Sequence, residues 1–138
     1  MQTLAIIKPD AIASGKAGAI LKHLQEAGFT LRAARLVRLT LPQAEAFYAV
    51  HKERPFFGDL TKFMSEGPVV VSVLEGANAI ERYRELLGAT NPEKAAPGTV
   101  RQLYGTNVER NAAHGSDAPE TAAVEIAFFF NALELHPR

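Results

Sequence analysis

The sequence predicts one α+β domain of 138 residues, in which a small sheet carries helices on one face. Three observations support this prediction. Segments with apolar residues at helical spacing alternate with short apolar or alternating segments, in the order β-α-β-α-α-β-α. Residues 69–74 form a continuous run of mostly β-branched residues bounded by turn residues, which is the clearest strand. No internal repeat or second domain is visible.

The first third of the chain gives a strand, a helix and a second strand. Residues 3–7 are an apolar run that ends before Pro9, because proline cannot donate to a ladder. Residues 16–27 have apolar side chains at spacings of three and four, and Gly28 follows as a stop. Residues 29–39 alternate and are expected to form a second, half-exposed strand. One face of this strand should carry Phe29, Leu31, Ala33, Arg35, Val37 and Leu39.

Helical patterns surround the central strand. Thr40 and Gln43 resemble a capping box that opens a helix extending to about residue 51. A second short helix is expected over residues 56–64, after Pro55. A third is expected over residues 78–87, with these side chains inward and Gly88 as the stop: Ile80, Tyr83 and Leu87.

From residue 89 to about residue 115 periodicity fades, and a structureless run of this length in a compact domain is usually functional. The last element, over residues 120–130, fits a strand or a helix. Helical spacing favours a helix with these side chains inward: Ala123, Ile126, Ala127 and Phe130.

Composition excludes several classes of protein. Lysine plus arginine and aspartate plus glutamate both number 15, which argues against a basic, nonspecific nucleic-acid binder. The absence of cysteine excludes disulfides and thiolate zinc sites. No apolar run has membrane-spanning length and no signal-peptide pattern is present, so the expected location is the cytoplasm, without membrane contact.

One stretch, N-A-A-H-G-S-D at residues 111–117, has the character of a reactive site. His114 lies between small residues that keep the imidazole accessible, although a lone histidine is more often structural. Ser116 and Asp117 are too close in sequence to form a hydrolase triad with it. The four histidines (His23, His51, His114 and His136) have no zinc-ligand spacing, and Ser14-Gly15-Lys16 lacks the remainder of a phosphate loop.

A set of cations spread over the chain suits phosphoryl transfer: Lys8, Arg84 and Arg101. Each alone is more often a solvated surface charge. Together they can balance the charge on phosphoryl oxygens and hold the attacking atom in line.

The chain resembles nucleoside diphosphate kinase over nearly its whole length. The stretch at 111–117 matches the family's active-site signature. Five further motifs match in order: Ile7-Lys8-Pro9-Asp10, Arg54-Pro55-Phe56-Phe57, Gly67-Pro68-Val69-Val70, Leu87-Gly88-Ala89-Thr90-Asn91-Pro92 and Pro97-Gly98-Thr99-Val100-Arg101. The resemblance implies a ferredoxin-like α/β sandwich with a four-stranded antiparallel sheet covered by helices.

The resemblance also implies a reaction. His114 would take the γ-phosphate of a nucleoside triphosphate, typically ATP, and pass it to a nucleoside diphosphate in a ping-pong exchange. Glu125 matches the carboxylate that orients the imidazole, and Ser116 would bond to that carboxylate. Tyr48 and Lys8 match residues near the γ-phosphate and the sugar.

The nucleotide-binding residues follow from the same resemblance. Arg84, Thr90 and Arg101 match the phosphate-binding set, and Asn111 with Lys8 would reach the ribose hydroxyl. Phe56 would stack on the base, flanked by Leu60 and Val108, which predicts broad base specificity. Mg²⁺ would be held mainly by the nucleotide phosphates and water.

Two departures from the family pattern bear on this expectation. Gln102-Leu103-Tyr104 lacks the carboxylate expected after Arg101, so how Arg101 is held is open. Val50 replaces an acidic residue that is common in the family.

Two other functions are alternatives to the kinase: a catalytically silent nucleotide-binding or regulatory module on the same fold, and a small nucleic-acid binder. The chain lacks the excess of basic residues and the aromatic residues on strands that the second alternative, RNA recognition, needs. The resemblance further implies a homo-oligomer, a tetramer or a hexamer, built from a common dimer.

Overall fold

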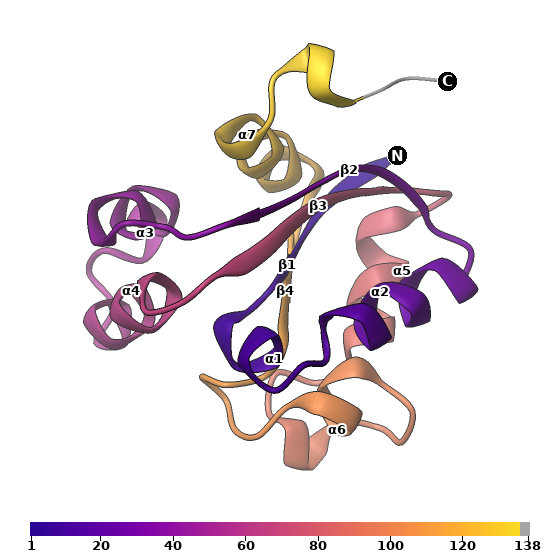
Figure 1. Cartoon of the computed structure of the whole chain (residues 1–138), viewed down its shortest axis with the longest axis horizontal. Helices are drawn as coiled ribbons and strands as arrows, with labels where there is room; N and C mark the ends of the chain where they lie inside the picture. Colours follow the sequence, from indigo (N-terminus) through magenta and orange to yellow (C-terminus); the bar gives the residue numbers. More distant parts are fainter. Residues whose placement is uncertain (136–138) are drawn as a thin grey trace.

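The computed structural model describes residues 1–135, arranged around a four-stranded antiparallel sheet with the order β2-β3-β1-β4 (Figure 1). The sheet contains β1 (Gln2–Ile7), β2 (Thr30–Val37), β3 (Val69–Glu75) and β4 (Ala113–Gly115). The α-helices are α1 (Pro9–Ala13), α2 (Ala17–Glu26), α3 (Leu41–Phe47), α4 (Phe57–Ser65), α5 (Ala79–Leu87), α6 (Val100–Tyr104) and α7 (Pro119–Phe129). Short 3₁₀ turns are η1 (Ala49–His51), η2 (Pro92–Lys94) and η3 (Ala132–Leu135). His136, considered above as a zinc ligand, lies outside the described residues.

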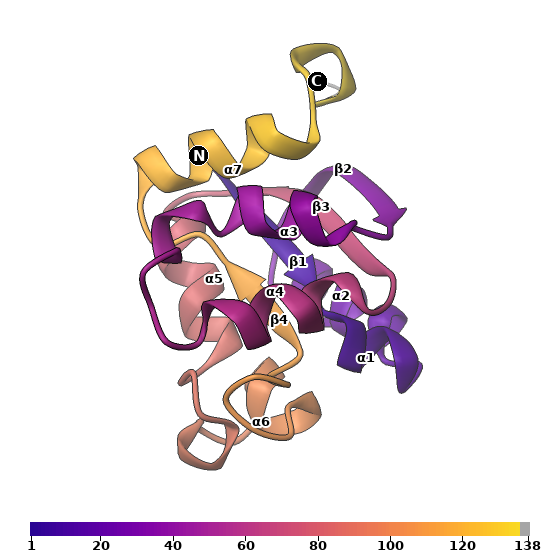
Figure 2. The ribbon, with the colours of Figure 1, turned by 90° about the vertical axis from the view of Figure 1, so that its left-hand side faces the viewer.

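Helices cover both faces of the sheet, so the expectation of helices on one face only is wrong. Leu4 and Ile6 of β1 pack with α3, α4 and α7, whereas Ala5 and Ile7 pack with α1, α2 and α5. All four of these β1 side chains are fully buried. Because alternate residues of a strand point to opposite faces, an apolar residue at every position requires cover on both faces. Figure 2 shows α3 and α4 lying together across one face, with α7 above them.

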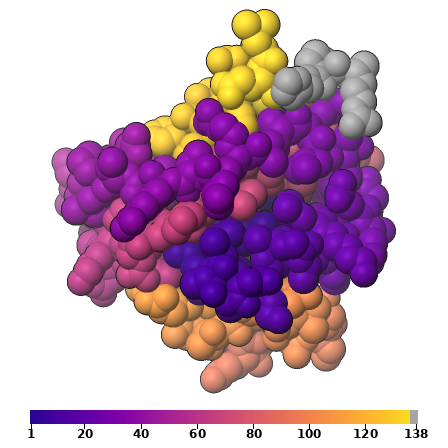
Figure 3. All heavy atoms as spheres, in the orientation of Figure 1, coloured from indigo at the N-terminus to yellow at the C-terminus, as the bar shows by residue number. Residues whose placement is uncertain are grey.

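Figure 3 shows the surface from the direction of Figure 1, in which α3 and α4 lie at the left of the sheet and α2 and α5 at the right. In Figure 3 the amino-terminal part of the chain, from indigo to purple, fills the centre of the molecule's visible face. The orange α6 region lies below it and the yellow carboxyl-terminal segment lies above. The first and last parts of the chain are in contact, because α7 packs against β1 and β4 pairs with β1.

The second strand does not present the single apolar face that its alternation predicts. Its pairing with β3 shifts register between Leu31 and Ala33, which places an extra residue in β2. Phe29 and Leu31 consequently pack on the α2 and α5 side, whereas Ala33 packs on the α3 and α4 side, together with Leu39. Arg35 is exposed. A bulge is invisible to a strict period of two, and this explains the error.

The loop expected over residues 89–115 contains ordered structure. It includes η2, α6 and the fourth strand, β4, which pairs with β1 through His114 opposite Ile6. Three residues are too few for a periodic signal, so β4 emerges only from its partner. The last element is a helix, as favoured, and it buries Ile126, while Ala123 and Ala127 are exposed and Ala122 and Phe129 are buried.

Helix boundaries follow the sequence signals. The Thr40–Gln43 capping box is formed by both of its hydrogen bonds. Ile80, Tyr83 and Leu87 are buried, as the helical spacing predicts. Gly88 ends α5 with a positive φ of 85°. Among the described residues, none of the helices combines the length and apolar character that crossing a membrane requires.

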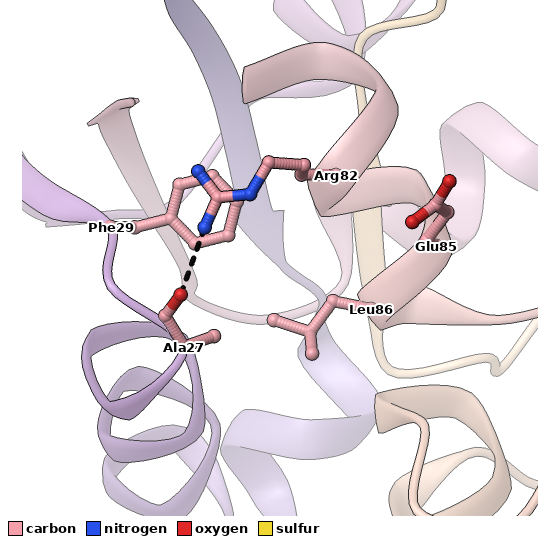
Figure 4. A pocket seen from close by; sticks show the side chains of 5 residues that line it. All are labelled: Ala27, Phe29, Arg82, Glu85 and Leu86. Atoms are coloured by element: carbon pink, nitrogen blue, oxygen red, sulfur yellow. Dashed lines mark hydrogen bonds between the residues drawn. The ribbon is translucent and has the colours of Figure 1, made fainter. Parts of the chain in front are cut away.

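A single arginine joins two of the turns on the α2 and α5 side (Figure 4). Arg82 donates to the carbonyl of Ala27 at 2.9 Å and to that of Ala77 at 3.0 Å. Its guanidinium also lies 4.6 Å from the ring centroid of Phe29, within range of a cation–π interaction. Arg82 thus fixes the turn before β2 against the turn before α5.

Candidate active site

His114 lies on β4 and is oriented by a carboxylate from α7. Its Nε2 is 2.9 Å from Oε1 of Glu125, and Oγ of Ser116 donates to the same oxygen at 2.8 Å. Ser116 is fully buried and its Oγ accepts the Leu4 amide at 3.4 Å, so the pair is anchored to β1. A ring nitrogen facing a carboxylate carries the proton, which leaves Nδ1 with its lone pair. This geometry indicates which ring nitrogen faces Glu125, a point that the sequence leaves open.

The imidazole is reachable from solvent. The His114 side chain is 20 % exposed and forms part of the wall of a cavity of about 470 Å³. Phe47 and Tyr48 meet the ring edge-on, with centroids 5.7 and 6.3 Å from it. These contacts fix the ring plane while leaving one side open.

Nine of the residues predicted for catalysis or nucleotide binding line this one cavity: Lys8, Tyr48, Phe56, Leu60, Thr90, Arg101, Val108, Asn111 and His114. They come from the junction of β1 and α1, the α3–α4 region, the segment after α5, α6, the loop before β4 and β4 itself. Segments as far apart in the sequence as Lys8 and His114 therefore converge on one site. Ser116 and Glu125 support the site from behind His114 and do not line the cavity.

Arg84 is the one residue predicted to bind the nucleotide that is not in this cavity wall, because it lines a neighbouring cavity of about 540 Å³. The two cavities share Thr90 and Arg101, so Arg84 is next to the site and not inside its main chamber. Asp117 also borders the neighbouring cavity.

Lys8 is buried, lines the cavity and is held by two hydrogen bonds. Its Nζ donates to Oδ1 of Asn111 at 2.8 Å and to the Glu109 carbonyl at 3.4 Å. Burial, and secondarily the charge of Arg101, lowers the pKa of Lys8 to about 8. The charge of Lys8 is therefore sensitive to pH near neutrality, unlike that of an ordinary lysine.

Arg101 is held by main-chain carbonyls. Its Nη1 donates to the Gly88 carbonyl and its Nη2 to the Ala113 carbonyl, both at 3.0 Å. These bonds answer the question left by the missing carboxylate in Gln102-Leu103-Tyr104. Burial lowers the pKa of Arg101 from its ordinary value, although arginine stays protonated at neutral pH. Val50, the other departure, is largely exposed and is not part of the cavity wall.

The aromatic side chains at the site have different environments. Phe56 is 48 % exposed at the cavity, which does not fit a core residue. Tyr48 is buried, its hydroxyl has no hydrogen-bond partner among the described residues, and burial raises its pKa. A buried hydroxyl without a partner is unusual and calls for an explanation, such as a group that binds beside it.

Sequence reasoning missed two residues of the cavity wall, His51 and Glu109. The His51 ring lies 5.5 Å from that of Phe56 and is stacked on Tyr48 at 6.5 Å. Its position three residues after Tyr48 on a helical segment was a usable signal. Glu109 had none, because the loop before β4 has no periodicity.

Comparisons with known proteins agree with this geometry. The family model described as "Nucleoside diphosphate kinase" matches residues 1–135. A nucleoside diphosphate kinase of Nitratidesulfovibrio vulgaris is 58 % identical over 134 residues, covering 97 % of this chain and 96 % of that protein. One from Bordetella avium is 58 % identical over 137 residues, covering 99 % and 97 %.

Solved structures give the same result for the fold. The nucleoside diphosphate kinase of Aquifex aeolicus superposes with a TM-score of 0.95 at 48 % identity, covering 97 % of both chains. The enzyme of Halobacterium salinarum, determined in complex with CDP, gives 0.95 at 37 % identity, covering 100 % of this chain and 92 % of the other.

Proposed function

Because this chain belongs to the nucleoside diphosphate kinase family, we propose that it moves the phosphoryl group through His114. The chain is a phosphotransferase that acts on nucleotides, as its full-length relatives are. The observation that supports His114 most directly is the 2.9 Å contact between its Nε2 and Glu125, which leaves Nδ1 nucleophilic beside a cavity with buried cations.

In the first half-reaction, Nδ1 of His114 attacks the γ-phosphorus of a nucleoside triphosphate. A phosphorus–nitrogen bond forms as the bond to the bridging oxygen breaks, and the nucleoside diphosphate leaves with that oxygen. The imidazole becomes positively charged, and the Glu125 carboxylate stabilises this charge through Nε2–H. In the second half-reaction, a terminal oxygen of another nucleoside diphosphate attacks the phosphorus and frees Nδ1.

Cations and polar groups of the cavity hold the polyphosphate and the sugar. Arg101 and Thr90 border both cavities, so phosphates bound near them are within reach of Arg84 as well. The Tyr48 hydroxyl, buried without a partner among the described residues, faces the transferred group. Lys8 and Asn111, already bonded to each other, bind the ribose hydroxyl.

The base lies between Phe56 on one side and apolar walls from Leu60 and Val108. A ring face and apolar side chains do not read the hydrogen-bonding edge of a base. Phe56 and Val108 are both exposed at the cavity, so their ring and methyl groups are open to a ligand. This arrangement supports broad base specificity.

The reaction of this family requires a divalent metal, and we propose Mg²⁺. Within residues 1–135 no three histidine or acidic side chains lie close enough to hold an ion by themselves. We propose that the nucleotide phosphates and water carry the cation, and Asp117 lies nearby at the wall of the Arg84 cavity. The cation would neutralise phosphate charge during transfer.

We also propose a homo-oligomer built from dimers, a tetramer or a hexamer, which acts in the cytoplasm. Apolar side chains remain exposed in two places that suit subunit contacts: Leu36 on the edge strand β2, and Val124 and Phe128 on α7. Sedimentation equilibrium would give the assembly, and cell fractionation would test the location.

A labelling experiment tests the role of His114. Incubation with γ-labelled ATP is expected to give an acid-labile, alkali-stable phosphoprotein, and His114→Ala is expected to abolish it. Label that persists in the variant would defeat the assignment. Nucleotide binding without ADP-dependent consumption of GTP would instead support the silent module.

A further inference from the structure

The turn that leads into β4 contains a residue in an unusual conformation. Ala112 has a φ of 75° and is fully buried. A residue with a Cβ rarely adopts a left-handed backbone conformation, and when it does the surrounding structure must hold it there. The residue lies two positions before His114, so what holds it bears on the site.

The conformation closes a very tight turn. The amide of Ala113 donates to the carbonyl of Asn111 at 2.9 Å, spanning Ala112 alone. This is a three-residue γ-turn, and the kind with a positive φ at its centre is the rare and strained one. Asn111 and the first residue of β4 are therefore set at a sharp angle to each other.

Both polar backbone groups of Ala112 are bonded to the junction between β1 and α1. Its amide donates to Oδ2 of Asp10 at 3.1 Å, and its carbonyl accepts the Lys8 amide at 2.9 Å. Oδ1 of Asp10 is buried without a partner among the described residues. Burial raises the pKa of Asp10 and the Ala112 amide opposes this rise, so the carboxyl is kept at this place against the cost of desolvation.

Groups of the active site lie on each side of the turn. On one side, Asn111 accepts from Lys8 Nζ at 2.8 Å and donates to the Thr90 carbonyl at 3.0 Å. On the other side, Ala113 pairs with Ile7 in register. If Ala112 relaxed to a negative φ, these two sets of contacts would no longer fit together over so few residues.

We propose that Asp10 is a positioning residue for phosphoryl transfer: by holding the strained turn at Ala112, it sets Asn111 and His114 in their places. Asp10 is not part of the cavity wall, so it acts through Ala112 and not on the nucleotide. The inference rests on the proposed roles of His114 and Asn111.

The test uses single-turnover formation of the phosphohistidine at saturating γ-labelled ATP, measured per folded enzyme. Asp10→Ala removes the acceptor and is expected to lower the rate about 10- to 100-fold, the scale of a misplacement near 1 Å. Asp10→Asn keeps an oxygen that can accept from the Ala112 amide and is expected to retain most of the rate. If Asp10→Ala does not fold, Asp10→Ser replaces it, because its hydroxyl is too short to reach the same amide.

A second substitution tests whether Asp10 acts by holding the turn at Ala112 or only by stabilising the fold. Glycine adopts a positive φ without strain, so Ala112→Gly makes the carboxylate less necessary. In the Ala112→Gly background the loss caused by Asp10→Ala is expected to be smaller by about threefold or more, the low end of coupling between contacting residues. Glu120→Ala is the matched control, since Glu120 follows Pro119 in α7 as Asp10 follows Pro9 in α1, but is exposed.

The outcomes separate this inference from the proposed function. Wild-type enzyme that forms no phosphohistidine would defeat the role of His114 itself. Normal wild-type labelling with an unchanged rate in Asp10→Ala, or equal losses with alanine and glycine at position 112, would overturn the role of Asp10 alone.

Discussion

Oε1 of Glu125 lies 2.9 Å from Nε2 of His114, and these two residues come from different elements, α7 and β4. The contact fixes the tautomer as well as the ring orientation, because only a protonated nitrogen bonds to a carboxylate. Ser116 holds the same oxygen from the buried side at 2.8 Å. The proposed nucleophile is thus Nδ1, and its basicity and the orientation of its ring depend on the carboxylate of Glu125.

The first prediction concerns this carboxylate. Glu125→Gln is expected to lower kcat about 10- to 100-fold, because a hydrogen bond to a charged group contributes about 1.5–3 kcal/mol. Steady-state transfer from ATP to a second nucleoside diphosphate measures it. Ser116→Ala, which leaves the contact between Glu125 and His114 in place, is expected to cost less. A larger loss in Ser116→Ala would contradict the assignment.

The second prediction concerns pH. Burial lowers the pKa of Lys8 to about 8, so its positive charge is lost as pH rises through that value. Because kcat/KM reports groups of the free enzyme, it is expected to fall above about pH 8. In Lys8→Arg this fall should be absent, although the overall rate is lower. A pH profile that is the same in both proteins would argue against Lys8.

Stability should change in the opposite sense over the same interval. The ordinary pKa of lysine is 10.5, above the value in the folded chain, so the unfolded chain binds this proton more tightly. The contribution of Lys8 to the free energy of unfolding therefore rises between about pH 8 and 10.5. Denaturant unfolding of wild type and Lys8→Met at several pH values measures this difference.

The third prediction concerns the base. Phe56→Ala is expected to lower kcat/KM by about 5- to 150-fold, since stacking on an aromatic ring contributes about 1–3 kcal/mol per base. The factor should be similar for purine and pyrimidine nucleotides. Leu41→Ala is the control, because Leu41 is 47 % exposed, as against 48 % for Phe56, but lies on α3 outside the cavity wall. A loss restricted to one class of base would refute the stacking role.

The fourth prediction concerns the metal. A chelator is expected to stop phosphohistidine formation, and added Mg²⁺ to restore it in proportion to the metal–nucleotide complex. Nucleotide-free protein should bind Mg²⁺ only weakly in calorimetry, because no cluster of ligands is present within residues 1–135. Tight binding of Mg²⁺ without nucleotide would show that a protein site exists.

The fifth prediction concerns the glycine that ends α5. Gly88 has a φ of 85°, and a Cβ there would lie 2.5 Å from Oγ1 of Thr99. Gly98 has a φ of 86° with open space around it. Gly98→Ala should therefore cost about 1 kcal/mol for the backbone alone, and Gly88→Ala should cost more.

Activity separates the same two substitutions. The Gly88 carbonyl accepts from Arg101 at 3.0 Å, so displacement of Gly88 is expected to lower the transfer rate, whereas Gly98→Ala should leave it unchanged. Thermal unfolding and the transfer assay together test this pair. If the two substitutions destabilise the protein equally, the close approach to Thr99 does not contribute to the cost of Gly88→Ala.

The sequence by itself determined the longer helices and the three longer strands, because periodicity and caps are local, but it did not indicate the short helices α1 and α6. The capping box at Thr40 and Gln43 and the stop at Gly88 formed where the residues placed them. The six motifs also determined the family, and with it the antiparallel sheet and the expected site residues. The assignment of one domain stays a prediction.

Tertiary structure alone decided the rest, because these features depend on contacts between distant residues. The bulge in β2 and the strand β4 exist through their partners, β3 and β1. The hydrogen bonds that hold Arg101 come from backbone carbonyls, which carry no signal in the sequence. The ring nitrogen of His114 that faces a carboxylate is set by Glu125, which comes from another element, and the positive φ of Ala112 occurs where its amide meets Asp10.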